Sequence, residues 1–326
     1  MVPRLVLIVG PTAVGKTSIA MSLYDELGGA SAAQIISVDS AMIYRDMDIG
    51  SAKPSKAELE RYPHALVDIR DPNEAYSVAD FVRDADEVVL NAMAQGKHAI
   101  LVGGTMLYAK KFVEGIADLP EADEATRAQL KKEYEQQGGE RLYAELQSVD
   151  PLAAEEIHPN NPQRLLRALE VVRMTGSPMS DLWEKHKGAD VRERIGQQPL
   201  IYGLFPGDRN KLHAVISDRF DEMVKEGFLD EVLRLQARGD LELDMPAMRA
   251  VGYRQAWMHL KGEIDANHFL ADAKTATRRL AKRQMTWMRQ WQGLKQIEVD
   301  DPERIVGQMV KDIVGESGFT LAGVAQ

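Results

Sequence analysis

The sequence predicts an α/β protein built on a doubly wound parallel sheet, with a helical insertion in the sheet domain. An apolar run, Leu5–Val9, leads directly into residues 10–17, whose glycines and lysine are spaced as in a phosphate-binding loop. Segments with strand-like and helix-like patterns then alternate along the chain. Residues 118–198 interrupt this alternation, because no apolar strand occurs among them. These three observations favour a parallel sheet that binds its ligands at the carboxyl ends of the strands.

The first element is the loop itself, which fits G-x-x-x-x-G-K-[ST] and reads Gly10-Pro11-Thr12-Ala13-Val14-Gly15-Lys16-Thr17. Glycine lets backbone N–H groups turn toward phosphate oxygens, and the helix that starts near Lys16 directs the positive end of its dipole at the same point. Lys16 adds a charge, and Thr17 adds a hydroxyl ligand for Mg2+. The motif therefore predicts a P-loop NTPase-like core that holds a diphosphate, which need not be part of ATP.

The next strand leads to a candidate catalytic group. Apolar spacing predicts a helix over residues 18–27, ended by two glycines, and a strand over residues 34–38. Asp39 follows this strand, so it lies at the edge of the sheet that carries the phosphate loop. A carboxylate there can accept a proton from a nucleophile. The alternative is a helix N-cap, for which Asp is favoured.

A second strand-to-helix turn follows further along the chain. We expect a loop at residues 49–54, a short strand over 65–68, and a helix that starts at Ser77 with a capping box. The strand 99–102 then ends in Gly103-Gly104-Thr105. Backbone can approach a ligand closely at such glycines, and Thr105 can hydrogen-bond it. Thr105 can instead be the cap of a tight turn.

The insertion is predicted to be helical. Helices are expected over residues 122–137 and 140–147, followed by one that is capped by Asn161, has Pro162 in its first turn and stops at Gly176. Arg164 and Arg167 share one face of that helix, where they bind phosphates or belong to a solvated face. The predicted organisation is a first part of the core in residues 1–117, the insertion in 118–198, and the rest of the core with C-terminal helices in 199–326.

The last third of the chain carries concentrated positive charge. A strand is predicted over residues 199–205, and helices are predicted over 209–238 and 251–259. Apolar residues at spacings of three and four predict an amphipathic helix within residues 273–295. This stretch has no acidic residue, and its basic residues are Lys274, Arg278, Arg279, Lys282, Arg283, Arg289 and Lys295. Such a helix suits a nucleic-acid backbone; the alternatives are a membrane surface or partner helix, and an ordinary solvated face.

Composition excludes several classes of protein. The chain has 326 residues, 44% hydrophobic and 28% charged, as expected of a globular protein with one large and one smaller domain. The absence of cysteine excludes disulfides, thiolate metal sites and a cysteine nucleophile. The chain shows neither a signal-peptide pattern nor a long apolar run, so we expect a cytoplasmic protein with no membrane partner. The net charge of −10 disfavours polyanions overall, but the basic helix is a local exception.

Two classes of enzyme fit these residues. A carboxylate at a strand end beside a phosphate loop is the layout of a small-molecule kinase that uses ATP. The second class is a transferase whose substrate loses diphosphate while a nucleic acid supplies the nucleophile. The basic helix favours the transferase, because a metabolite kinase has no need of it. A pure binding protein has little use for Asp39 beside the loop.

Taken together, these motifs resemble the tRNA dimethylallyltransferase family, also called tRNA isopentenyltransferase, in its bacterial type. The resemblance extends to about Gln296 and is carried by residues 10–17, 36–40, 49–54, 101–105, 158–170, 250–255 and 277–289. It implies transfer of a dimethylallyl group from dimethylallyl diphosphate to N6 of the adenosine just 3′ of the anticodon, in tRNAs that read codons beginning with U. The C-terminal zinc finger of eukaryotic relatives is absent from this sequence.

The resemblance also implies roles for individual residues. Asp39 accepts the proton of the adenine amine, while Lys16, Thr17, Mg2+ and the loop amides stabilise the departing diphosphate. The adenine leaves its stack to enter a channel, in which Thr105 lies near the reacting groups. The partners are tRNA and dimethylallyl diphosphate, and we expect a monomer.

Further positions match the family's tRNA-contacting stretches. These are Asp39, Ser40, Ala41, Met42, Thr105, Arg127, Asn161, Pro162, Gln163, Arg164, Leu165, Arg249, Ala250, Val251, Gly252, Tyr253, Arg254, Lys282, Arg283, Gln284, Trp287 and Arg289. Two positions depart from the family pattern. Met42 stands where many members have Gln, and Met106 stands where many have a third glycine.

Overall fold

The computed structural model describes residues 2–117, 119–120, 123–185 and 188–315. The chain divides into two compact units. The core unit consists of residues 1–113 and 191–326, and the insertion unit consists of residues 114–190. The boundary predicted at residue 118 and the end of the chain from residue 316 lie outside the described residues.

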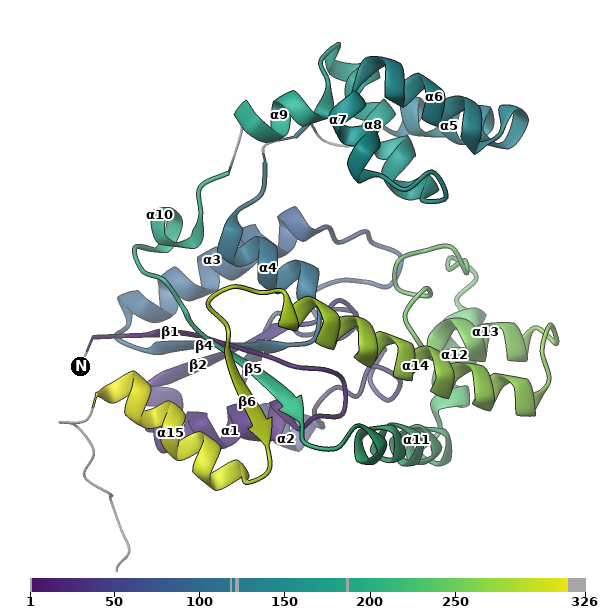
Figure 1. Cartoon of the computed structure of the whole chain (residues 1–326). Helices are drawn as coiled ribbons and strands as arrows, with labels where there is room; N and C mark the ends of the chain where they lie inside the picture. The colour runs from purple at the N-terminus through teal and green to yellow at the C-terminus, as the bar shows by residue number, and fades with distance from the viewer. Residues whose placement is uncertain (1, 118, 121–122, 186–187, 316–326) are drawn as a thin grey trace, which may run out of the picture. The chain divides into compact units, whose positions relative to one another are not determined.

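A single parallel sheet forms the centre of the core unit (Figure 1). Its strands are β1 (Leu5–Val9), β2 (Ala33–Val38), β3 (His64–Ala65), β4 (His98–Gly103), β5 (Leu200–Pro206) and β6 (Lys295–Val299), in the order β3-β2-β4-β1-β5-β6. β1 and β4 are fully buried, as expected of central strands in a parallel sheet covered on both faces. The predicted α/β class with a doubly wound parallel sheet is confirmed.

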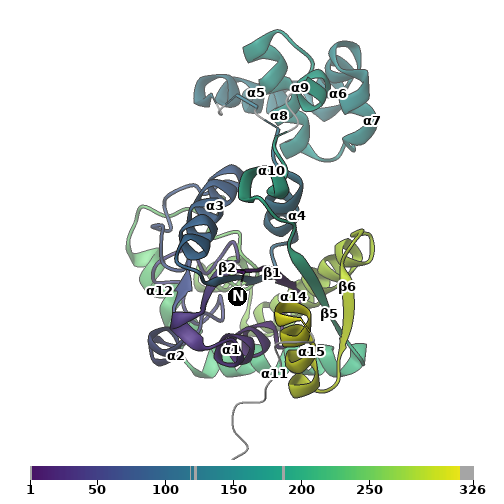
Figure 2. The ribbon, with the colours of Figure 1, turned by 90° about the vertical axis from the view of Figure 1, so that its left-hand side faces the viewer.

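Helices cover both faces of the sheet (Figure 2). On one face, α1 (Lys16–Glu26) and α15 (Pro302–Val314) pack their apolar residues against side chains from β1, β2, β4 and β5. On the other face lie α3 (Val78–Ala94) and α4 (Met106–Glu114). α3 begins at Ser77 with the predicted capping box, because Ser77 and Asp80 each accept a hydrogen bond from the other's backbone N–H. Because helices cover both faces, the sheet is open at the carboxyl ends of its strands, which we call its open edge.

The rest of the core unit is helical. Short segments are η1 (Gly29–Ser31), α2 (Lys56–Arg61) and α10 (Val191–Ile195). A group of longer helices follows β5 and comprises α11 (Arg209–Lys225), α12 (Phe228–Ala237), α13 (Tyr253–Leu260) and α14 (Ala266–Arg289). α11 and α14 share a small apolar core of Leu212, Ile216, Ala281 and Met285. This contact places α14 beside the open edge of the sheet.

The insertion unit contains α5 (Glu124–Gln137), α6 (Gly139–Val149), α7 (Pro151–Glu156), α8 (Pro162–Thr175) and α9 (Met179–Lys185) around an apolar core of its own. α8 has the predicted ends, since Asn161 Oδ1 accepts a hydrogen bond from the Arg164 N–H at 3.2 Å and Gly176 follows the helix with a left-handed φ of 68°. α10 belongs to the core unit, although the sequence placed residues up to 198 in the insertion.

Several elements differ from the sequence-based predictions. The strand expected over residues 65–68 is only His64–Ala65, because Leu66 and Asp68 have left-handed φ values of 63° and 56° that no strand accommodates. Residues 209–238 form two helices, which Gly227 separates with a φ of 99°. The basic helix runs over Ala266–Arg289, starting earlier and ending earlier than predicted.

Candidate functional site

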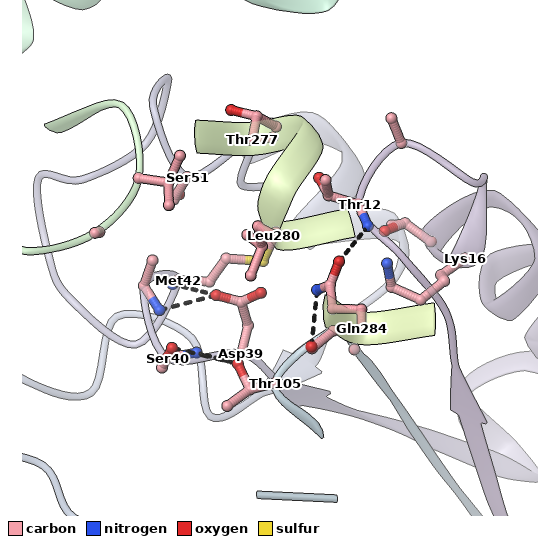
Figure 3. A pocket seen from close by; sticks show the side chains of 18 of the residues that line it. Thr12, Lys16, Asp39, Ser40, Met42, Ser51, Thr105, Thr277, Leu280 and Gln284 are labelled. Atoms are coloured by element: carbon pink, nitrogen blue, oxygen red, sulfur yellow. Dashed lines mark hydrogen bonds between the residues drawn. The ribbon is translucent and has the colours of Figure 1, made fainter. Parts of the chain in front are cut away.

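A cavity of about 710 Å³ opens at the carboxyl ends of β1, β2 and β4 in the core unit. The phosphate loop, the turn after β2 and the turn after β4 form its floor. Residues 50–54, α11, the segment before α13, and α14 form its walls. Figure 3 shows Lys16 and Asp39 on opposite sides of this space, with Gln284 and Leu280 of α14 between them. The predicted diphosphate loop and the predicted base therefore share one cavity.

The phosphate loop turns sharply from β1 into α1. Gly10 has no room for a side chain, because a Cβ there would lie 2.8 Å from Val14 Cγ1 and 3.1 Å from the Leu204 carbonyl oxygen. Ala13 and Gly15 have left-handed φ values of 66° and 93°, and Gly15 caps α1. This conformation aims the N-terminus of α1 into the cavity, where the helix dipole favours an anion.

Lys16 lies at the first turn of α1 and faces the cavity. Its Nζ donates a hydrogen bond to the Pro11 carbonyl oxygen at 2.8 Å. Burial lowers the pKa of Lys16 to about 8; the Asp39 carboxylate opposes this change, and the Arg219 guanidinium reinforces it. An anion in the cavity would favour the charged form of Lys16, because it would replace part of the lost hydration.

Arg219 of α11 is a second cation in the cavity wall that the sequence-based reasoning missed. Although part of its side chain reaches solvent, loss of water lowers the pKa of Arg219, and Asp39 partly offsets this effect. Within the described residues, no carboxylate forms a salt bridge with Arg219. The sequence holds no signal for it, because it lies inside an ordinary amphipathic helix. Its position beside Lys16 and Asp39 suits a phosphate oxygen.

Asp39 uses one carboxylate oxygen to shape its own turn. Oδ1 accepts hydrogen bonds from the backbone N–H groups of Ala41 at 2.8 Å and Met42 at 3.2 Å. Oδ2 has no hydrogen-bond partner among the described residues. No helix follows Asp39, so the N-cap alternative is wrong, and the residue caps a turn. The remaining oxygen is available to a group in the cavity (Figure 3).

Thr105 connects the two strand-end turns. The Ser40 N–H donates to Thr105 Oγ1 at 3.0 Å, and the Thr105 hydroxyl donates to Ser40 Oγ at 3.3 Å. The strands approach so closely here that a Cβ on Gly103 would lie 2.0 Å from the Val38 carbonyl oxygen. Thr105 therefore holds the Asp39 turn in place while it lines the cavity.

A buried carboxylate holds the loop at residues 48–50 against the wall. Glu231 of α12 is 2% exposed. Its Oε2 accepts hydrogen bonds from the Asp48 and Ile49 N–H groups at 2.9 and 2.8 Å, and its Oε1 accepts from the Gly50 N–H at 3.1 Å and the Tyr253 hydroxyl at 2.7 Å. Burial and the Glu231 charge raise the pKa of Tyr253 well above its usual value. The sequence predicted a loop for this segment but gave no anchor for it.

The basic residues of the stretch 273–295 divide into two groups. Lys274 Nζ lies 2.6 Å from an Asp221 carboxylate oxygen, and Lys295, which belongs to β6, lies 2.5 Å from Asp312. Arg278 donates to the Ser217 and Thr275 hydroxyls. The exposed cations of α14 that form no salt bridge within the described part of the chain are Arg279, Lys282, Arg283 and Arg289. The predicted cationic face is therefore smaller than the sequence suggested.

Many of the positions predicted to contact tRNA line this cavity. They are Asp39, Ser40, Ala41, Met42, Thr105, Arg249, Ala250, Val251, Tyr253, Arg283, Gln284 and Trp287. Gly252, Arg254, Lys282 and Arg289 lie close in the chain but do not line it. The side chains of Tyr253 and Gln284 are buried, and their polar atoms bond to other parts of the protein.

The remaining predicted tRNA positions belong to the insertion unit. Pro162, Gln163 and Arg164 are exposed in the first turn of α8. Leu165 is 0% exposed in the core of the unit, so only its backbone is available to a ligand. Arg127 donates to the buried carboxylate of Glu170 at 3.3 Å, and Arg167 donates to the same carboxylate at 2.9 Å. Arg167 therefore forms a structural ion pair.

The cavity fits Mg2+ only together with a phosphate ligand. No group of three or more His, Cys, Asp or Glu side chains in the described part of the chain could hold a metal. The Thr17 hydroxyl lines the cavity and supplies one protein oxygen. Mg2+ commonly keeps several waters and binds through one or two protein oxygens plus substrate phosphates. This donor set matches that pattern.

Two comparisons with known protein sequences point to the same family of transferases. A model of the IPP transferase family matches residues 42–291. The tRNA dimethylallyltransferase of Chromohalobacter salexigens is 51% identical over 298 residues, which cover 91% of this chain and 93% of that protein. Among the described helices, none has the length and apolar character to cross a membrane.

Solved structures show the same fold. The tRNA isopentenylpyrophosphate transferase of Bacillus halodurans has a TM-score of 0.68 at 35% identity, and 96% of each chain is covered. That of Staphylococcus epidermidis has a TM-score of 0.66 at 30% identity, with 95% of this chain and 98% of that chain covered. A eukaryotic dimethylallyltransferase acting on tRNA has a TM-score of 0.77 at 22% identity, with 99% and 81% covered, and shows the fold alone. This chain belongs to the IPP transferase family.

Proposed function

We propose that this protein is a tRNA dimethylallyltransferase. It transfers the dimethylallyl group of dimethylallyl diphosphate to N6 of the adenosine 3′-adjacent to the anticodon, in tRNAs that read codons beginning with U. The observation that carries this proposal is the shared cavity, in which the free Oδ2 of Asp39 faces the same space as Lys16 and the phosphate loop. The 51% identity to a tRNA dimethylallyltransferase supports it.

The cavity suits both parts of the first substrate. The α1 N-terminus, Lys16 and Arg219 supply positive charge for the diphosphate. Apolar side chains line the α11 and α14 walls and are suited to the hydrocarbon tail; they are Val215, Ile216, Met223 and Leu280. A ligand with an anionic diphosphate head and a short apolar tail fits this division of the cavity.

The reaction forms one bond and breaks another. The lone pair of adenine N6 attacks C1 of the allyl group, and the allylic C–O bond breaks with its electron pair leaving on the diphosphate. Asp39 Oδ2 takes the N6 proton, while Lys16 and Arg219 stabilise the negative charge that develops on the leaving oxygen. When bound, Mg2+ supplies further neutralisation of that charge, with Thr17 as its protein ligand.

A kinase is the natural competitor for the same loop, because phosphate loops also bind ATP. The comparisons do not favour it, since the matched family and the similar proteins are transferases. The tRNA is proposed to reach the cavity along α14, and the target base must leave its stack to do so.

The test is a reaction without nucleoside triphosphate. Purified protein, Mg2+, labelled dimethylallyl diphosphate and tRNA are expected to give labelled tRNA and free diphosphate in equal amounts. Lys16→Ala is expected to reduce transfer severely, because the charge acts in a site with little water. A requirement for ATP, or phosphate from ATP on a small acceptor, would replace the transferase with a kinase.

A further inference from the structure

Gln284 of α14 is buried in the cavity wall, and both ends of its amide bond to the protein. The side chain is 6% exposed. Its Oε1 accepts a hydrogen bond from the Thr12 N–H of the phosphate loop at 2.9 Å, and its Nε2 donates to the Gly104 carbonyl oxygen at 2.8 Å (Figure 3). One end accepts and the other donates, so the amide has a single orientation that satisfies both bonds.

We propose that Gln284 is a positioning residue for diphosphate binding: it holds the phosphate loop in its binding geometry by tying Thr12 to the β4 turn. The inference rests on the proposed function, because it takes diphosphate as the ligand of the loop. It gives Gln284 a role different from the tRNA contact that the family resemblance implies. α14 then serves both substrates, with exposed cations on one face and this amide on another.

The conformation of the loop explains why such a tie is needed. Ala13 follows Thr12 directly and has a left-handed φ of 66°. A non-glycine residue there is strained, and such a conformation persists only where the surroundings impose it. The bond from Gln284 holds the Pro11–Thr12 peptide, which is one peptide before the one that joins Thr12 to Ala13. Without it, the loop loses a constraint at the point where its backbone N–H groups must converge on phosphate oxygens.

The turn after β4 is built around the same amide. A Cβ on Gly104 would lie 2.6 Å from Gln284 Nε2, so any side chain at position 104 displaces the amide. The next nearest atom, the Gly10 carbonyl oxygen, is at an ordinary contact distance of 3.6 Å. Gly104→Ala therefore disturbs the link from its other end, without altering Gln284 itself.

The experiment measures binding of inorganic diphosphate with Mg2+ by calorimetry in the absence of tRNA, and binding of tRNA separately. Gln284→Leu keeps the size of the side chain and removes both hydrogen bonds. We expect it to weaken diphosphate binding about tenfold, the change expected for the loss of the one hydrogen bond that reaches the phosphate loop. The KM for dimethylallyl diphosphate should rise by a similar factor. The affinity for tRNA should stay close to wild type.

Two further variants make the result specific. Gln290→Leu makes the same change at an exposed position at the end of α14 and should leave diphosphate binding unchanged. Gly104→Ala should weaken diphosphate binding as Gln284→Leu does, and the double variant should be no worse than either single one, since both break one link. Gly104→Ala also tests the link if Gln284→Leu fails to fold.

The inference is overturned if Gln284→Leu weakens tRNA binding and leaves diphosphate binding intact, because Gln284 would then act as a tRNA contact. Additive effects in the double variant would also overturn it. A wild-type protein that binds no diphosphate would sink the proposed function as well. If the wild-type protein binds diphosphate and the variants bind it equally well, the proposed role of Gln284 is wrong but the proposed function stands.

Discussion

At the scale of single residues, Asp39 has two separable tasks. Oδ1 holds the turn after β2 through two backbone N–H groups, while Oδ2 is available to the proton of the nucleophile. Alanine would remove both tasks at once. Asparagine keeps an acceptor for the turn and removes the base, so it isolates the chemical role.

We therefore expect Asp39→Asn to bind tRNA normally and to turn over about 10²- to 10⁴-fold more slowly, the range for a positioned general base. Single-turnover rates and filter binding measure the two quantities. Asp39→Ala should in addition bind dimethylallyl diphosphate more weakly, because its turn is no longer fixed. If Asp39→Asn stays within a few-fold of wild type, the carboxylate only shapes the turn.

The sequence predicted some residues of this cavity and could not predict others. Lys16, Thr17 and Asp39 follow directly from a loop motif and from their place at strand ends. Arg219 lies inside a helix with no motif around it, so only packing brings it to the cavity. The burial of Gln284 and Tyr253 could not be predicted for the same reason. A sequence pattern does not show which polar groups hydrogen-bond to one another across the fold.

At the scale of elements, the loop at residues 48–50 depends on one buried charge. Glu231 accepts four hydrogen bonds there, three of them from backbone N–H groups. Gly50 is required at this position, since a Cβ would lie 2.1 Å from Phe228. Residues 50–52 line the cavity, so the anchor also fixes part of its wall.

Glu231→Gln is expected to destabilise the protein by about 3 kcal/mol, because an amide nitrogen would face donors and leave buried groups unsatisfied. Urea unfolding measures this change. Glu226→Gln makes the same charge change at an exposed position and should be nearly neutral. Equal stability of the two variants would mean that the loop has another anchor.

The exposed cations of α14 give a second prediction at this scale. Replacing Arg279, Lys282 and Arg289 with glutamine should weaken tRNA binding and flatten its dependence on salt, by about 0.7 to 0.9 of a unit of slope for each phosphate that the protein no longer binds. Lys56→Gln and Lys261→Gln, at exposed positions off α14, are the controls. A slope of log affinity against log salt that does not change would assign this face to solvent.

Near the C-terminus the sequence analysis missed α15 and β6 and misplaced the start of α14. α15 was missed although Asp301 caps it and Pro302 occupies its first turn, and its apolar side chains complete the core beneath α1. β6 was missed because it is an edge strand with mostly exposed or half-buried residues and no continuous apolar run. The N-terminal part of α14, residues 266–273, contains Asp272 and no lysine or arginine, so the basic pattern alone placed its start too late.

At the scale of the whole molecule, local charge matters more than the total. The chain carries a net charge of −10, yet the cavity and the exposed face of α14 gather cations. The core unit alone brings together the phosphate loop, Asp39 and α14. The parallel sheet and its ligand edge could be predicted because one motif at the first strand end determines where the ligand lies.

The central claim is that the nucleophile is the exocyclic amine of one adenine. The most direct measurement is digestion of tRNA after reaction with dimethylallyl diphosphate, with mass spectrometry to locate the added group. The account predicts a single dimethylallyl group on N6 of the adenosine 3′-adjacent to the anticodon, and no addition when guanosine replaces that adenosine, since guanine has no amine at that ring position. A dimethylallyl group at another nucleotide or another atom, or its persistence on the guanosine variant, would contradict it.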